Sequence, residues 1–264
     1  MIPAANPFQS AQVAQLYRSG RPFHHPRALE RILRIVGGAH PRRALDIGCG
    51  TGLSTVALAA IAGEVVGVDP VEEMIAAAPR LDNVSYRIAP AEGLPFGTGE
   101  FDAVTVSSSL HWFDQAGFFA EARRVLRVGG WLANYDHYFV AEMVEDTAFA
   151  HWAKETYLSR FPAPPRGGHF DSSGIRPGFV YLGDDRYEDP IAMDCTQLVD
   201  YLLTQSNGIA ATEKGQITWG ELREWLTEEL RAFFPSPDTS RTLRFLGVVD
   251  CLRAAAVPSG ESSR

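Results

Sequence analysis

The chain has 264 residues, of which 45% are hydrophobic and 21% are charged, a composition that is typical of a folded globular protein and excludes global disorder. Its 32 acidic and 24 basic residues give a formal net charge of -8, so the average surface repels phosphate backbones and a nucleic-acid partner is not expected. The spacing of Cys49, Cys195 and Cys251 fits neither a metal site nor a disulfide framework, so we expect neither. The chain has no apolar leader and no run of about 20 consecutive apolar residues. We therefore expect a cytoplasmic protein without a membrane span.

Helical and strand patterns alternate along the first half of the chain. Apolar periodicity predicts helices at 9–20, 27–36, 54–62, 71–78 and 115–126. Buried strands are predicted at 44–47, 65–69, 84–88, 101–107 and 131–135. Gly129 and Gly130 are expected to end the helix that precedes the last strand. Strands separated by helices in this way favour right-handed crossovers and a parallel sheet.

The regular alternation stops after about Asp136, where the chain becomes aromatic and helical before a Pro- and Gly-rich loop at 161–169. This segment predicts a cap or insertion. Later strands are expected at 186–193 and 241–249, and helices near 196–203 and 219–233. The Ser-rich tail at 258–264 is expected to be frayed.

The segment LDIGCGTG at 45–52 places an acid at the end of a predicted strand and follows it with three alternate glycines. Missing side chains let a ligand lie against the backbone, and the next helix presents free N–H groups. A dinucleotide fingerprint has the spacing GxGxxG, whereas Leu53 stands three positions after Gly50 here, so a pyrophosphate ligand is disfavoured. Asp69 ends the next strand, where a carboxylate can accept hydrogen bonds from both hydroxyls of a ribose or cap the following helix. The pattern predicts a nucleoside site without a phosphate cradle.

Five segments in order carry a resemblance to a known family. They are LDIGCGTG (45–52), VVGVDP (65–70), AEGLPF (91–96), FDAVTVSSSLHWFD (101–114) and RVLRVGG (124–130). The series resembles the class I S-adenosylmethionine-dependent methyltransferases over about residues 40–136. LHWFD and Tyr17-x-x-x-Arg21-Pro22 are also similar to the small-molecule subgroup that includes trans-aconitate methyltransferase.

The resemblance implies a doubly wound α/β fold. We expect a mostly parallel, Rossmann-like, seven-stranded sheet with a helical insertion after the fifth strand. The chain would then divide into an N-terminal helical lid (1–40), an S-adenosylmethionine-binding core (41–136) and a substrate cap with the closing strands of the sheet (137–264).

The resemblance also implies the residues that bind S-adenosylmethionine. They are Asp46, Gly48, Cys49, Gly50, Gly52, Asp69, Pro70, Met74, Ala91, Glu92 and Ser107. Asp46 would orient the ammonium group or its water, Asp69 would hold the ribose, and Ser107 would offer its carbonyl to the ammonium. Pro70 and Met74 would contact the adenine ring, while Ala91 and Glu92 would meet its polar edge. Many relatives carry an Asp where this chain has Pro90, so Glu92 or a backbone carbonyl is expected to bind the adenine amino group.

Candidate acceptor contacts lie elsewhere in the chain. Methyl transfer is an in-line displacement, so the protein chiefly aligns the acceptor and, where required, removes its proton. SSSL at 107–110 replaces the Asn/Asp-Pro-Pro-aromatic motif of relatives that methylate nucleic acid or glutamine, which favours a small-molecule acceptor. His111 is either a general base or a positioning group. Tyr17 and Arg21 are candidates in the lid, where Arg21 pairs with the cofactor carboxylate, pairs with an anionic substrate, or is simply exposed.

Further aromatic and histidine side chains complete the candidates. Trp112, Tyr135 and His137 follow the fourth and fifth strands and are expected to contact the substrate. The aromatics of the insertion either line an apolar pocket or form a core. They are Trp152, Tyr157, Phe161 and Phe170.

The sequence therefore predicts a methyltransferase that acts as a monomer or homodimer on an oxygen, nitrogen or carbon of a small, acidic or aromatic molecule. A non-catalytic S-adenosylmethionine-binding module is the alternative, and a nicotinamide-dependent oxidoreductase is disfavoured by the glycine spacing.

Overall fold

A single mixed sheet organises the protein. The structure is a computed structural model that describes residues 8–164, 177–236 and 238–256. Its strands are β1 (Arg43–Ile47), β2 (Glu64–Asp69), β3 (Val84–Ile88), β4 (Phe101–Ser107), β5 (Leu126–Met143), β6 (Phe179–Glu188), β7 (Ile191–Met193) and β8 (Arg241–Ala254).

The strand order is β3-β2-β1-β4-β5-β8-β6. The first five of these strands pair in parallel, whereas β8 is antiparallel to both β5 and β6. Strand β7 pairs with the beginning of β8, around Leu243. On its other side, Leu243 pairs with β5. Strand β7 therefore lies on the same side of β8 as β6 and continues the edge of the sheet that β6 forms. The described sheet is thus seven strands wide, and the predicted doubly wound, mostly parallel fold is confirmed.

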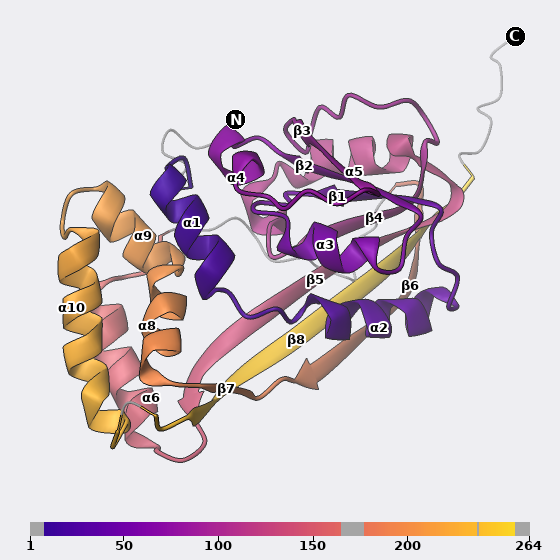
Figure 1. Ribbon diagram of the computed structural model, residues 1–264. Helices are drawn as coiled ribbons and strands as arrows, with labels where there is room; N and C mark the ends of the chain where they lie inside the picture. Colours follow the sequence, from indigo (N-terminus) through magenta and orange to yellow (C-terminus); the bar gives the residue numbers. More distant parts are fainter. Residues whose placement is uncertain (1–7, 165–176, 237, 257–264) are drawn as a thin grey trace, which may run out of the picture.

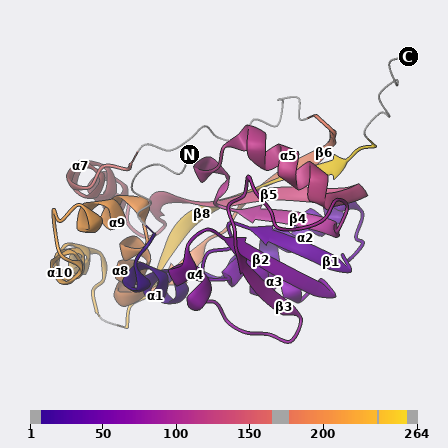
Figure 2. The ribbon, with the colours of Figure 1, turned by 90° about the horizontal axis from the view of Figure 1, so that it is seen from above.

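Helices cover the sheet and extend beyond one end of it. They are α1 (Ala11–Gly20), α2 (His25–Val36), α3 (Leu53–Ala59), α4 (Glu72–Ala76), α5 (Gln115–Val125), α6 (Ala148–Trp152), α7 (Leu158–Arg160), α8 (Cys195–Leu203), α9 (Ser206–Glu213) and α10 (Trp219–Leu230), with 3-10 turns at Leu110–Trp112 and Arg231–Phe233 and a π turn at Ala153–Tyr157. Helices α6 to α10 gather at one end of the sheet, and we call them the cap (Figure 1 and Figure 2). Helix α1 packs between α8 of the cap and α4.

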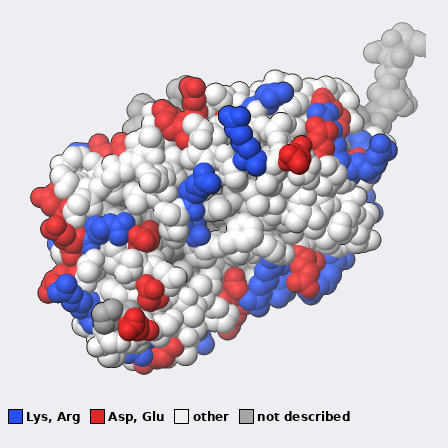
Figure 3. Space-filling model, viewed as in Figure 1, with Lys and Arg blue, Asp and Glu red and all other residues white. Residues whose placement is uncertain are grey.

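The two faces of the sheet are buried by different helices. Leu29 and Ile32 of α2 recur at helical spacing and pack with Leu58 of α3 on one face. Phe118 and Phe119 of α5 pack with the opposite set of strand residues. Basic and acidic side chains are interspersed over the exposed side of α2 (Figure 3). No described helix has the length and apolar character needed to cross a membrane.

Strand β5 differs most from its prediction. It begins at Leu126, directly after α5, and runs to Met143, whereas the sequence predicted a strand over 131–135. Residues beyond Tyr135 stay in the sheet because β8 supplies hydrogen-bond partners as far as Leu243. The domain boundary predicted between residues 136 and 137 therefore falls inside a strand. The division into lid, core and cap is otherwise a prediction.

Other elements also depend on distant partners. Strand β6 begins at Phe179 rather than 186, and β8 continues to Ala254 because both pair along their full length. Helix α9 was not predicted. The tail at 258–264 lies outside the described residues.

The aromatic side chains of the insertion form a core. Trp152, Tyr157 and Phe161 are at most 8% exposed and pack with the apolar sides of α8 and α10. The Trp152 indole N–H donates to Glu229 at 2.9 Å, which satisfies its polar edge. These three residues therefore hold the cap together rather than lining a pocket, and Phe170 lies outside the described residues.

Candidate active site

A cavity of about 1100 Å³ lies at the carboxyl ends of the parallel strands. Its walls come from the glycine turn after β1, the end of β2, the segment after β4, the N-terminal segment around α1, and α9. Ligands of doubly wound folds bind at this edge of the sheet. Pockets that hold one small ligand typically measure roughly 300–1000 Å³, so this cavity is slightly larger than that range.

The three glycines after β1 serve different purposes. Gly48, Gly50 and Gly52 all have positive φ angles, of 68°, 52° and 80°. A Cβ on Gly48 would lie 2.7 Å from that of Ser109, and one on Gly52 would lie 2.5 Å from the Tyr86 hydroxyl. A Cβ on Gly50 would meet nothing within 4 Å, and Gly50 lines the cavity. Gly50 therefore leaves room for a ligand against the backbone, while Gly48 and Gly52 allow close packing.

Asp69 lies at the end of β2 and on the cavity wall. Its Oδ2 accepts a hydrogen bond from the Gly50 N–H and its Oδ1 accepts one from the Val71 N–H, each at 2.9 Å. Burial raises the pKa of this carboxyl group, and the two backbone hydrogen bonds oppose that shift. Each oxygen keeps a lone pair for a further donor. Asp69 can thus order the turn before α4 and still accept hydrogen bonds from a ligand.

Asp46 does not line the cavity. Its carboxylate is fully buried, with Oδ2 accepting from Ser54 and Thr55 at 2.6 and 2.7 Å and Oδ1 accepting from Thr105 at 2.9 Å. Burial raises its pKa, and the three hydroxyl donors oppose that effect. The Asp46 carboxylate is therefore not placed to contact the cofactor ammonium directly. Asp46 instead ties β1 to α3 and β4, which fixes the glycine turn.

Segments after β2 and β3 bring apolar and polar groups to the cavity. Pro70 follows β2, Met74 lies on α4 and is 3% exposed, and Ala91 and Glu92 follow β3; all four line the cavity. Glu92 Oε1 accepts a hydrogen bond from the Asp114 N–H at 2.7 Å. These side chains have the character expected around an adenine ring, with Pro90 beside them.

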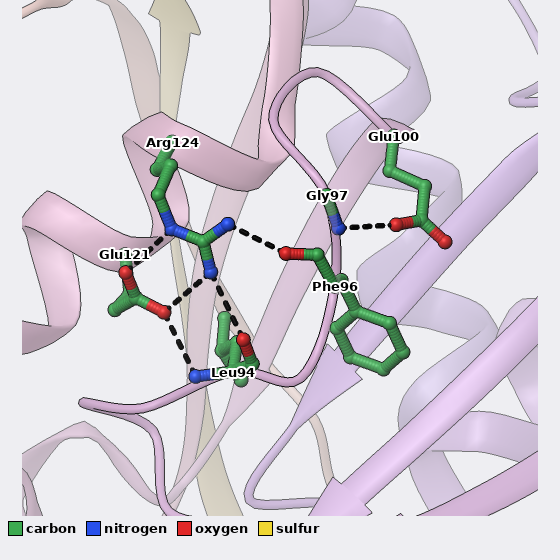
Figure 4. Close-up of polar contacts among 6 residues, drawn as sticks. All are labelled: Leu94, Phe96, Gly97, Glu100, Glu121 and Arg124. Atoms are coloured by element: carbon green, nitrogen blue, oxygen red, sulfur yellow. Dashed lines mark hydrogen bonds and ion pairs between the residues drawn. The ribbon is translucent and has the colours of Figure 1, made fainter.

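An ion pair on α5 holds the continuation of this loop (Figure 4). The Arg124 guanidinium donates to the carbonyls of Phe96 and Leu94 at 2.5 and 2.9 Å. Glu121 accepts from Arg124 and from the Leu94 N–H at 2.7 and 2.8 Å. The hydrogen bond from Arg124 holds the pKa of Glu121 below its ordinary value. The pair thus fixes both ends of Leu94, just after the cavity-lining residues.

The segment after β4 bends sharply into the cavity. Ser108 has a φ of 50°, a left-handed conformation that is uncommon for a residue other than glycine. Ser107, Ser109, His111 and Trp112 also line the cavity. The Ser109 hydroxyl lies within hydrogen-bond distance of the Ser107 carbonyl, at 2.8 Å, and of the Gly48 carbonyl, at 2.9 Å. Backbone strain at such a position often accompanies a functional site.

Arg21 lies on the cap side of the cavity. Its Nη2 donates to the Tyr17 hydroxyl and to the Thr204 carbonyl, both at 2.8 Å, and its guanidinium lies 4.4 Å from the centre of the Tyr17 ring. Its Nε is buried without a hydrogen-bond partner among the described residues. No ion pair to a carboxylate balances this half-buried charge in the part of the chain that is described. A cation in this state favours an anionic ligand.

Two histidines that the sequence analysis did not select line the same side. His24 directly precedes α2 and His25 is the first residue of that helix, and both reach the cavity. His25 Nδ1 lies 3.0 Å from the Tyr135 hydroxyl, and the His24 ring stacks on His137. Tyr135 and His137, which were predicted to contact substrate, thus lie behind these two rings and not on the wall.

Comparison with known proteins assigns the family. A methyltransferase domain model matches residues 45–134. A proposed methyltransferase of Dictyostelium discoideum is 29% identical over 227 residues, or 81% of this chain and 83% of that protein. An uncharacterised methyltransferase of Mycobacterium tuberculosis is 39% identical over 115 residues, or 43% of this chain and 46% of that protein.

A solved structure decides the assignment. The structure of a proposed type II methyltransferase from Anaeromyxobacter dehalogenans is 30% identical, with a TM-score of 0.66, over 88% of this chain and 97% of that chain. The chain belongs to the class I S-adenosylmethionine-dependent methyltransferases. S-adenosylmethionine is the cofactor of this methyltransferase, and the open space at Gly50 and the spare lone pairs of Asp69 fit its adenosyl part.

The cavity of the methyltransferase contains most of the predicted site residues. Those on its wall are Gly48, Cys49, Gly50, Asp69, Pro70, Met74, Ala91, Glu92, Ser107, His111, Trp112, Tyr17 and Arg21. Asp46, Gly52, Tyr135 and His137 are not on it. The missed pair at 24 and 25 follows the Tyr17-x-x-x-Arg21-Pro22 motif after one intervening residue, and this proximity is the signal that could have identified it. Among the described residues, no cluster of His, Cys, Asp and Glu could hold a metal ion.

Proposed function

We propose that this methyltransferase methylates a small molecule that carries an anionic group, on an oxygen, nitrogen or carbon atom. One observation carries the proposal: a single cavity is lined both by the Asp69 carboxylate and by the Arg21 guanidinium, which has no carboxylate partner among the described residues. The first group suits a ribose and the second suits an anion. The cavity is slightly larger than the usual range for one small ligand, which supports the binding of an acceptor beside the cofactor.

The cofactor-binding roles follow from the wall of the cavity. We assign Asp69 to the ribose hydroxyls, Gly48, Cys49 and Gly50 to backbone contact with the methionine and ribose parts, and Ser107 to the ammonium. Pro70, Met74, Ala91 and Glu92 would surround the adenine. When bound, S-adenosylmethionine supplies an electrophilic methyl group on a sulfonium. The protein is left to align the acceptor with that methyl group.

The acceptor-binding roles lie on the opposite side. We assign Arg21 to the anionic group of the acceptor, with Tyr17 holding the guanidinium in place through its hydroxyl. His111 and Trp112 follow β4 and would bound the space between acceptor and cofactor. If the anion is a carboxylate that is itself methylated, no proton has to be removed, and His111 then acts by positioning.

Label transfer tests the proposal. The protein is incubated with tritium-labelled S-adenosylmethionine and a panel of aliphatic and aromatic carboxylic acids, phenols and amines, and the extracted products are counted. We expect label in carboxylic acids and not in simple amines. Binding of S-adenosylhomocysteine without transfer to any panel member would favour the non-catalytic binding module.

An Arg21→Gln variant separates the two anions that Arg21 could bind. Calorimetry is performed with S-adenosylhomocysteine, which has the cofactor carboxylate, and with 5′-methylthioadenosine, which lacks it. We expect both affinities to stay within twofold of wild type while label transfer falls. A loss of affinity confined to S-adenosylhomocysteine would assign Arg21 to the cofactor and remove the support for an anionic acceptor.

A further inference from the structure

His24 lies at the end of the cavity that is remote from the adenosine-binding groups. Its ring and that of His25 contact residues of β5, whereas Asp69 ends β2. In the order β2-β1-β4-β5 these two strands are three steps apart, or about 14 Å at the usual spacing. His24 therefore faces the part of the cavity where the acceptor would bind, beside Arg21.

A stack of three rings fixes the plane of the His24 imidazole. Its centroid lies 4.0 Å from that of His137, with 6° between the ring planes. The other face of His137 lies on Phe245 at 4.8 Å and 8°. His137 Nε2 lies 2.9 Å from Asp189 Oδ2, and Asp189 also forms an ion pair with Arg27. His24 thus rests on a side chain that is itself held in plane and in position.

The two nitrogens of His24 have different surroundings. Nδ1 is buried and has no hydrogen-bond partner among the described residues. Nε2 is not among the buried unpartnered atoms, and no described residue bonds to it, so it keeps access to the cavity that the ring lines. A buried N–H without a partner is rarer in proteins than a buried acceptor without one. The hydrogen is therefore better placed on Nε2, where a ligand can accept it.

The surroundings also keep the imidazole uncharged. Burial lowers the pKa of His24, and the neighbouring His25, His137 and Arg21 lower it further. Burial likewise lowers the pKa of His25, to about 3, and that of His137, although Asp189 opposes the shift at His137. The charged groups around this cluster are Arg21 from its own segment, Arg27 from α2 and Asp189 behind His137. A neutral ring can donate from one nitrogen only.

We propose that His24 contacts the methyl acceptor by donating an Nε2–H hydrogen bond to one of its oxygens, and that His137 positions the ring through the stack. The inference deepens the proposed function and rests on it. Together with the Arg21 guanidinium, His24 gives the acceptor end two kinds of hydrogen-bond donor, which selects an oxygen-bearing acceptor over an amine. His137 is a positioning residue because it does not reach the cavity.

Two substitutions at position 24 separate contact from packing. His24→Phe keeps a flat ring for the stack but has no donor, and His24→Gln restores an N–H near the position of Nε2. With the carboxylic acid that wild type labels fastest, we expect His24→Phe to raise KM about five- to tenfold with kcat within twofold. We expect His24→Gln to recover at least half of that loss. His151→Gln, in an exposed position on α6, is the control and should match wild type.

Stability and cofactor affinity show whether His24 is merely structural. His24→Phe removes a buried unpartnered nitrogen, so its melting temperature should equal or exceed that of wild type. Its affinity for S-adenosylhomocysteine should stay within twofold. An unchanged KM, or a parallel loss of melting temperature, cofactor affinity and activity, would refute the proposal. Absence of label transfer by wild type would instead count against the proposed function.

Nitrogen NMR gives a test that needs no acceptor. In protein labelled with ¹⁵N-histidine, the His24 signals are identified by their absence from His24→Gln. We expect the neutral tautomer with hydrogen on Nε2 between pH 5.5 and 8. Hydrogen on Nδ1, or a charged ring in this range, would overturn the proposal. A His137→Phe variant should preserve the stack and the tautomer, whereas His137→Ala should raise KM as His24→Phe does.

Discussion

Replacing Asp69 with alanine affects both the fold and the cofactor. The side chain is 9% exposed and accepts hydrogen bonds from the N–H groups of Gly50 and Val71. Alanine leaves both donors without this acceptor, at about 1 kcal/mol each, so we expect the free energy of unfolding to fall by about 2 kcal/mol. The hydrogen bond from Gly50 to Asp69 is not apparent from the sequence. Loss of the charged acceptor for two ribose hydroxyls should cost about 2 kcal/mol of binding, or roughly 30-fold in Kd.

Calorimetry and urea unfolding measure the two effects separately. S-adenosylhomocysteine is titrated at a temperature where circular dichroism shows both proteins to be folded. Asp69→Asn serves as the matched control, because it keeps the shape and one acceptor oxygen, and its affinity should lie between those of wild type and Asp69→Ala. A folded Asp69→Ala protein whose Kd lies within twofold of wild type would show that Asp69 only orders the turn before α4.

Three further substitutions test other parts of the structure. Gly50→Ala should weaken S-adenosylhomocysteine binding at least tenfold in calorimetry, and the positive φ of Gly50 should cost about 1–2 kcal/mol of stability. In Gly48→Ala the added Cβ meets Ser109, so this variant should lower the melting temperature more than Gly50→Ala does. Arg124→Gln should lower the melting temperature at pH 7. Arg124 lowers the pKa of Glu121 from its ordinary value of 4.5. The stabilisation from this ion pair is therefore complete above pH 4.5 and is lost as the pH falls through the folded-state pKa of Glu121. The difference in melting temperature between Arg124→Gln and wild type should accordingly narrow by about pH 3.5. Burial and then Asp184 raise the pKa of Asp250 to about 6, which disfavours the charged form in the fold. Asp250→Asn should therefore raise the melting temperature at pH 8 but not at pH 4, and an equal effect at both pH values would contradict this account.

The parallel half of the fold could be predicted because its signals are local. Each strand from β1 to β4 is a short apolar run next to glycines or a helical pattern, and β3 and β4 have the predicted bounds. The extension of β5 past Tyr135 carried no such signal. His137 and Tyr138 stay extended because β8, more than 100 residues later in the chain, pairs with them.

The residues of the candidate site also divide into those that a local motif identifies and those that depend on distant packing. Asp69 and Gly50 could be predicted because their motif is contiguous and stands at strand ends. Asp46 belongs to the same motif, yet its side chain turns toward Ser54 and Thr105, and no spacing rule distinguishes a ligand contact from a buried support. His24 was missed because its place on the cavity wall depends on packing against a strand that the sequence did not predict to extend so far.

The long strands β5 and β8 make the cap inseparable from the cofactor half of the molecule (Figure 1). Strand β5 begins beside the parallel strand β4, and β8 ends beside that part of β5; the other ends of the two strands reach Met143 and Leu243, which belong to the core of the cap. Ala141, with a φ of 57°, interrupts the pairing, and the strands resume pairing beyond it. A graft that exchanged caps between relatives at residue 136 would therefore cut the β5–β8 pairing in the middle of its regular stretch, which runs from Trp131 to Phe139. Acceptor specificity in this protein is better transplanted by exchanging side chains on the cavity wall than by exchanging segments.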